Sequence, residues 1–411
     1  MVDTSSPLAA RHLDQLRRDC GEVITRDDAT YDEARRLWNA MHDRQPVAIV
    51  RPTSATKVAT AIRFAREHDL EIVVRSGGHS SAGLEGADGC LVIDLSAMRG
   101  VDVDPRTRIA RSNGGALLGE LDIAAQAHGL VCPTGVVGHT GVAGLTLGGG
   151  VGRLQRHFGL TIDNLSAVEI ATADGRLVRA TETDEPELFW GLRGAGWNFG
   201  IATAFEFRLQ PFGPDLHRGF LAFPASQLQD IWTVFHDFAP TAPDSVAAIF
   251  GLDRGVADAG YPDELVGQPI VYLAWNHSGS PDVVERDTAG LLKGRKPAVS
   301  TIGSNPYLAV QTAHDLVFAW GHRSFIRSHN ANDVRREALD DANVDWCRRV
   351  LAAVEPDRAL GAYANGNADT GPTEVRGFYG SAKLARLAAL KREWDPENVF
   401  HVNANIVPAG G

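Results

Sequence analysis

The chain of 411 residues has few cysteines and no long apolar run. Its four cysteines, Cys20, Cys90, Cys132 and Cys347, lie far apart and form no CxxC pair, which argues against a disulfide framework and against a thiolate zinc site. No segment reaches the roughly 18 apolar residues that a membrane span needs, and the first 20 residues lack the apolar core of a signal peptide. From these absences we expect a cytoplasmic protein with no membrane partner.

A surplus of positive charge is also missing. Lysine and arginine number 40 against 51 aspartates and glutamates, so the formal net charge is -11. Binding to nucleic acid depends on basic side chains that neutralise phosphates. The charge balance therefore argues against a nucleic-acid partner.

Several common motifs of catalysis are absent as well. The sequence contains no GxxxxGK[ST] phosphate loop and no GxGxxG between a strand and a helix, which argues against Walker-type and Rossmann-type nucleotide sites. It also lacks HExxH and GxSxG, the signatures of zinc proteases and α/β-hydrolases. We expect no metal site.

The sequence is, by contrast, rich in glycine, with 43 residues that gather in two clusters. The first cluster, VVRSGGHSSAG, covers residues 73–83, and the second, GVVGHTGVAGLTLGGGVG, covers residues 135–152. Such a run can be an irregular connection between packed elements. Two runs in one domain favour a different interpretation, because bare backbone lets N–H groups approach an anionic ligand closely.

His79 stands in the middle of the first cluster, where a tight turn would not require it. An imidazole between glycines can act as a base, a metal ligand or a nucleophile, and the residue pattern alone leaves these three roles open. No cysteine, histidine and carboxylate cluster lies near it in the sequence to complete a metal site.

Periodicity predicts a strand–helix–strand beginning and antiparallel strands after residue 165. The break PFGP at residues 211–214 predicts a domain boundary. The helices expected from the pattern cover residues 5–40, 53–67, 119–128, 226–238, 334–354 and 383–394. The strands expected from the pattern cover residues 46–50, 71–75, 90–95, 108–112, 166–172, 176–179, 202–209, 217–223, 246–252 and 269–275.

Several segments in the same order carry a resemblance to a known family: RSGGHSSAG, CLVIDLSAM, GVVGHTGVAGLTLGGGVGRL, LTIDNLSAVEIATADGRLVRAT, PELFWGLRGAGWNFGIATAFEFRL and YGSAKLARLAALKREWDPENVFHVNANIVP. The chain resembles the berberine-bridge-enzyme-like FAD-linked oxidoreductases of bacterial type, within the vanillyl-alcohol-oxidase/PCMH superfamily. The resemblance implies an α+β fold with three parts. These are a PCMH-type FAD-binding domain of two subdomains (1–211), a shortened substrate domain with an antiparallel sheet and helices (212–375), and a C-terminal segment that returns to the FAD domain (376–411).

The resemblance also implies roles for individual residues. His79 matches the histidine that bonds covalently to the flavin 8α carbon, and Cys132 lies too far from the glycine run to match a second attachment point, so it is expected to be a small buried residue. The other residues that match FAD-binding positions are Arg75, Ser76, Gly77, Gly78, Ser80, Gly83, His139, Thr140, Gly141, Val142, Gly144, Gly148, Gly149, Gly150, Gly152, Asn198, Gly200, Ile201, Asn403 and Asn405.

The implied reaction is hydride transfer from a hydroxylated small molecule (a sugar, phenolic or polyketide-like metabolite) to covalent flavin, with O2 as the acceptor. Many relatives use a tyrosine of a YxNY segment as the base, but here the segment is Tyr363-Ala364-Asn365-Gly366 and its last tyrosine is absent. Tyr363, Tyr307 and His139 are the candidate replacements. The altered segment and the shortened domain keep two alternatives open, a flavin-dependent oxygenase of natural-product biosynthesis and a flavin-binding paralogue without turnover.

Overall fold

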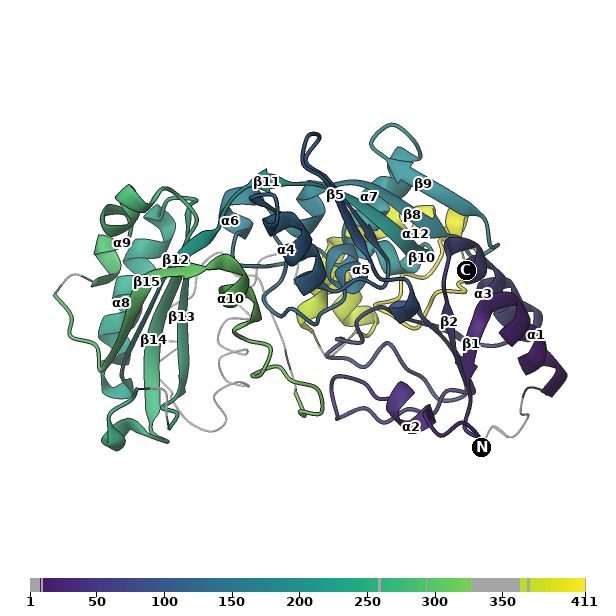
Figure 1. Cartoon of the computed structure of the whole chain (residues 1–411), viewed down its shortest axis with the longest axis horizontal. Helices are drawn as coiled ribbons and strands as arrows, with labels where there is room; N and C mark the ends of the chain where they lie inside the picture. The colour runs from purple at the N-terminus through teal and green to yellow at the C-terminus, as the bar shows by residue number, and fades with distance from the viewer. Residues whose placement is uncertain are drawn as a thin grey trace.

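The computed structural model describes residues 8, 10–257, 260–292, 294–324, 326, 363–367 and 370–410. Figure 1 shows two lobes of unequal size, with a sheet and its helices forming the smaller lobe and two further sheets within the larger one. Helices and antiparallel sheets in separate layers make this an α+β fold, as predicted.

The first sheet of the larger lobe has the order β1-β2-β4-β3. Strands β2 and β3 flank β4 and run parallel to it, while β1 pairs antiparallel with β2 at one edge. Its strands are β1 (Gly21–Ile24), β2 (Ala48–Pro52), β3 (Ile72–Arg75) and β4 (Leu91–Asp94). Helix α3 (Ala55–Glu67) covers this sheet and begins where the Ser54 hydroxyl accepts a hydrogen bond from Lys57 N at 3.3 Å, so the predicted helix is confirmed.

The predicted helix over residues 5–40 is wrong for most of its length. The structure has α1 (Ala10–Cys20), then the edge strand β1, then the short α2 (Tyr31–Ala34). The strand forms because residues 21–24 pair with residues 49–52 of β2, and Val23 and Ile24 are buried there. That pairing is a tertiary contact, which helical periodicity does not report.

The second sheet of the larger lobe has five antiparallel strands in the order β5-β6-β10-β8-β9. They are β5 (Val101–Asp104), β6 (Ile109–Asn113), β8 (Leu165–Ala171), β9 (Leu177–Thr181) and β10 (Ile201–Arg208). The largest core cluster joins this sheet to four helices, α4 (Leu118–Gln126), α5 (Val142–Leu147), α7 (Pro186–Ala195) and α12 (Pro372–Trp394). The C-terminal helix therefore packs into the larger lobe, behind α5 in Figure 1.

Helix α12 begins at Pro372, earlier than the predicted residue 383, because Gly380 with a φ of +69° joins two helical stretches. The predicted helix over residues 334–354 lies outside the described residues. The predicted shortening of the substrate domain also concerns this region and stays a prediction.

The smaller lobe is one antiparallel sheet in the order β13-β14-β12-β15. Its strands are β12 (Asp215–Pro224), β13 (Val246–Arg254), β14 (Pro269–His277) and β15 (Val299–Pro306). Helices α8 (Leu228–Phe238) and α9 (Val284–Leu292) pack on one face around Trp275 and Phe223. This arrangement matches the predicted antiparallel sheet with helices.

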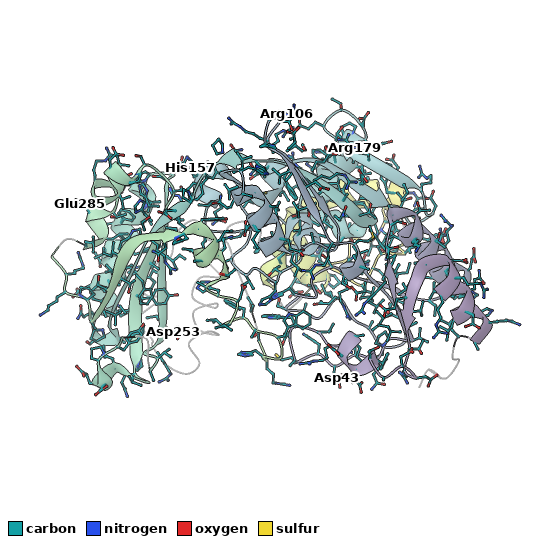
Figure 2. All side chains as sticks on the ribbon, in the orientation of Figure 1. Asp43, Arg106, His157, Arg179, Asp253 and Glu285 are labelled. Carbon is teal, nitrogen blue, oxygen red and sulfur yellow. The ribbon has the colours of Figure 1, made fainter. Side chains whose placement is uncertain are left out.

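Three short elements join the lobes. Strand β11 (Gln210–Pro211) pairs with β7 (Leu130–Val131), and α10 (Tyr307–Thr312) packs against α4 between the lobes (Figure 1). In α6 (Gln155–Phe158), His157 lies at the junction (Figure 2), where its Nδ1 forms a 2.9 Å hydrogen bond with the Ser278 hydroxyl of the smaller lobe. No helix in the described parts of the chain is both long and apolar enough to cross a bilayer.

Candidate active site

The two glycine clusters meet in the folded chain. A Cβ at Gly77 would lie 2.1 Å from Gly141 N, and a Cβ at Gly141 would lie 2.3 Å from Gly77 N. The hydroxyl of Ser76 donates to Gly114 O at 2.7 Å and holds the first loop where β3 ends. Only glycine permits this backbone-on-backbone contact, so both loops form one surface.

His79 lies on that surface, in the turn that Gly78 allows with a φ of +65°. Its Nε2 lies 2.7 Å from Nδ1 of His139, in the second loop, and its ring stacks on Trp38 with centroids 4.5 Å apart. Burial, and secondarily the neighbouring His139, lower the pKa of His79 to about 3. The imidazole is therefore neutral at physiological pH, which is the form that can act as a nucleophile.

The segment that follows α10 covers this histidine pair. His139 Nε2 lies 3.2 Å from the carbonyl oxygen of Asp315, whose Oδ1 accepts from Gly138 N at 2.7 Å. The Trp38 indole N–H donates to Phe318 O at 2.6 Å, and Trp320 meets the edge of the His79 ring at 6.5 Å between centroids. Sequence reasoning missed Trp38, Asp315 and Trp320, since no spacing in the sequence connects them to the glycine loops.

Arg75, Ser80 and Gly83 contact neighbouring parts of the chain around the first loop, and a Cβ at Gly83 would lie 2.4 Å from His42 Cγ. The Arg75 guanidinium is buried and donates to the carbonyls of Ala34 and Glu85. Ser80 N donates to Glu85 Oε1 at 2.8 Å, and burial raises the pKa of Glu85 to about 7. In this arrangement Arg75 and Ser80 shape the loop from beneath, and their contact with a cofactor pyrophosphate stays a prediction.

The second glycine run meets the segment around Tyr363. A Cβ at Gly148 would lie 2.1 Å from Asn365 Oδ1, and Asn365 Nδ2 donates to Leu145 O at 2.9 Å. The Tyr363 hydroxyl accepts from Asn365 Nδ2 at 3.0 Å and from Val151 N at 3.3 Å. The Tyr-x-Asn segment and the glycine run thus form a continuous wall.

The other glycines of the second cluster differ in whether the fold requires a glycine at their position. Gly149 and Gly150 have φ values of +128° and +83°, and a Cβ at Gly152 would lie 1.7 Å from Thr134 O, so these three glycines are required by the fold. Gly144, by contrast, is exposed on α5 and has no atom within 4 Å of a Cβ position. In addition, Thr140 and Val142 form backbone hydrogen bonds to the start of α4, which fix the loop.

The C-terminal tail returns to the residues just before β10. Asn198 is fully buried, donates to Ala404 O at 3.3 Å and accepts from Ile406 N at 2.9 Å. Asn403 Nδ2 donates to Trp197 O at 3.0 Å. Beside them, Gly200 has a φ of +154° and Ile201 pairs with Ala171 of β8.

Several buried polar atoms around this surface have no hydrogen-bond partner among the described residues. They include Thr146 Oγ1, Trp197 Nε1, Asn403 Oδ1 and Asn405 Oδ1. Buried polar groups normally find partners, and orphaned ones frequently mark a place where a ligand binds. A flavin, which carries both donors and acceptors on its ring, fits this set.

The candidate base Tyr307 lies away from the histidine pair, and Cys132 is in the core. Tyr307 is 1% exposed in a cluster with Val131 and Leu216 between the lobes, and its described contacts do not include the histidine pair. Cys132 is fully buried in the core beside Leu118, as expected for a small apolar residue, and burial raises its pKa. Within the described ranges no three metal-ligating side chains gather at one point.

Comparison with known proteins gives two family matches, one described as "FAD binding domain" over residues 46–181 and one as "Berberine and berberine like" over residues 362–407. The chain is 29% identical to (R)-6-hydroxynicotine oxidase of Paenarthrobacter nicotinovorans, over 95% of this chain and 97% of that protein. It is 38% identical to xylooligosaccharide oxidase of Thermothelomyces thermophilus, over 91% and 72% of the two chains. The crystal structure of 6-hydroxy-D-nicotine oxidase from Arthrobacter nicotinovorans superposes with a TM-score of 0.84 at 28% identity, covering 94% and 97%.

Proposed function

Because this chain belongs to the berberine-bridge-enzyme-like FAD-linked oxidoreductases, we propose that it is an oxidase with FAD bound covalently through His79. Its substrate is a hydroxylated small molecule (a sugar, a phenolic or a polyketide-like metabolite), and O2 takes the electrons. The observation that carries this proposal is the neutral His79 imidazole on the surface where Gly77 meets Gly141.

The residues present suit a flavin. The bare backbone of the two loops allows close approach of a pyrophosphate, and the unpartnered atoms of Thr146, Trp197, Asn403 and Asn405 can bond to ring atoms. When bound, FAD supplies hydride acceptance from a substrate C–H bond, and the protein supplies orientation and proton management.

Tyr363 is the best-placed candidate to exchange a proton with the hydroxyl group of the substrate. Its hydroxyl oxygen is fixed by N–H groups of Val151 and Asn365, and its ring lies 3.3 Å from a Cβ position on Gly149. A hydroxyl held in this way can exchange a proton with a substrate hydroxyl. His139 already bonds to His79, and Tyr307 lies between the lobes, so neither competes for this role.

The relatives support the choice of oxidase and of substrate class. Two of them are named as oxidases, one of hydroxynicotine and one of xylooligosaccharide, and both molecules carry hydroxyl groups. Gly366 in place of the last tyrosine of the YxNY segment keeps a flavin-dependent oxygenase as the second candidate.

The test is anaerobic mixing of the purified protein with 6-hydroxynicotine, xylooligosaccharides and simple phenols while the flavin absorbance is recorded. We expect at least one donor to bleach the flavin and air to restore it with release of one peroxide per flavin. Incorporation of oxygen into the product without peroxide would favour the oxygenase. If no donor reduces the flavin, the protein binds FAD without turnover and the proposal is wrong.

A further inference from the structure

The contacts of His79 and His139 determine where their ring protons lie. The Asp315 carbonyl oxygen can only accept a hydrogen bond, so His139 Nε2, at 3.2 Å, must carry a proton. A neutral imidazole has one N–H, which leaves Nδ1 of His139 as an acceptor. The 2.7 Å contact to His79 Nε2 therefore requires His79 to donate. The lone pair of His79 is then on Nδ1.

We propose that His139 is a positioning residue for covalent flavin attachment: it holds His79 in the Nε2–H tautomer, so that Nδ1 is the bonding atom, and it accepts the Nε2 proton during attachment. This inference rests on the proposed function, because it concerns the flavin bound there. It assigns to His139 a role in maturation of the enzyme, separate from substrate oxidation.

The balance of the attachment step shows why an acceptor is needed. One bond forms between His79 Nδ1 and the flavin 8α carbon, while one C–H bond of the 8-methyl group and the Nε2–H bond of His79 break. The two electrons pass through the flavin to O2, which takes up both protons and leaves as hydrogen peroxide. His79 must therefore lose its Nε2 proton, and His139 Nδ1 is the atom at hydrogen-bond distance from it.

The surroundings keep this arrangement in place. Trp38 stacks on the His79 ring with an angle of 23° between the planes, which limits rotation of the imidazole. Asp315, whose carbonyl oxygen contacts His139, is held in place because its side chain accepts a hydrogen bond from Gly138 N. The segment that carries Asp315 is anchored to the same Trp38 through Phe318 O. The burial that keeps His79 neutral leaves Nδ1 able to attack a carbon.

The experiment compares covalent incorporation of FAD into flavin-free full-length protein in three variants and wild type. His139→Leu removes the acceptor, and we expect attachment to slow about 100-fold, the scale of a lost acid–base group. His139→Asn places an amide oxygen near the position of Nδ1, and we expect part of the rate to return. His128→Leu, at an exposed turn after α4, is the matched control and should attach FAD at the wild-type rate. A wild-type rate in His139→Leu, or no recovery in His139→Asn, would overturn the proposal.

A second measurement decides the matter even if His139→Leu does not fold. Histidine labelled with ¹⁵N in the wild-type chain, with His79→Gln used to assign the signals, reports which ring nitrogen carries the proton. We expect His79 to be protonated at Nε2 before FAD is added, and protonation at Nδ1 would overturn the proposal. If wild type takes up no FAD at all, the proposed function fails instead, and the tautomer of His79 is still read separately.

Discussion

Replacing Lys391 by methionine is expected to lower the free energy of unfolding of the larger lobe by about 3–5 kcal/mol, the cost of breaking a buried ion pair. Lys391 Nζ lies 2.6 Å from Asp395 Oδ2, and both side chains are 0% exposed. The same ammonium donates to the carbonyls of Asn198 at 2.7 Å and Phe400 at 2.9 Å. Methionine fills a similar volume but donates nothing, so it leaves a buried carboxylate and two carbonyls without their partner.

The assay is urea unfolding of the holoenzyme, followed by flavin and tryptophan fluorescence. Lys383→Met is the matched control, since Lys383 is exposed on the same helix, and it should change the free energy by about 0.5 kcal/mol or less. Adding Asp395→Asn to Lys391→Met removes the unpaired charge and should recover part of the loss. A loss in Lys391→Met no larger than that of Lys383→Met would refute this reasoning.

Three further predictions concern the loops, the lobe junction and the candidate base. Gly77→Ala should abolish flavin retention, because its Cβ would lie 2.1 Å from Gly141 N, while Gly303→Ala, with open space around it, should retain flavin in the same absorbance measurement. Burial raises the pKa of Asp122 from 3.8 to about 7, so the folded state holds this proton more tightly. Stability should therefore fall as pH rises from about 4 to 7, and a urea series should show Asp122→Asn without that part of the dependence. Tyr363→Phe should slow flavin reduction about 100-fold or more in stopped-flow mixing while flavin content stays unchanged, and an unchanged rate would exclude it as the base.

The elements that local chemistry determines could be predicted from the sequence. Helix α3 follows its Ser54 cap, and β10 follows the β-forming residues of the segment 201–208. Each of these signals lies within the element that it predicts or next to it. The bare backbone of the two glycine clusters could also be predicted from the sequence, but their direct contact at Gly77 and Gly141 could not, because it depends on the fold.

The parts that could not be predicted depend on tertiary contacts. The segment of β15 shows no clear alternation of apolar and polar residues, and most of its side chains are at least partly exposed. It is a strand because it pairs with β12 at the edge of the smaller sheet. The role of Asp315 appears only when the segment after α10 brings its carbonyl to His139, 176 residues away in the chain. Tyr307 was a reasonable candidate base from its residue type, but its position between the lobes is decided by packing with Leu216.

The central claim is that this chain holds FAD covalently at His79, and it is tested most directly by acid precipitation of purified wild type and His79→Ala. We predict flavin absorbance in the washed wild-type pellet, and only in the supernatant for the variant. Covalent flavin in the His79→Ala pellet, or none in the wild-type pellet, would contradict the claim.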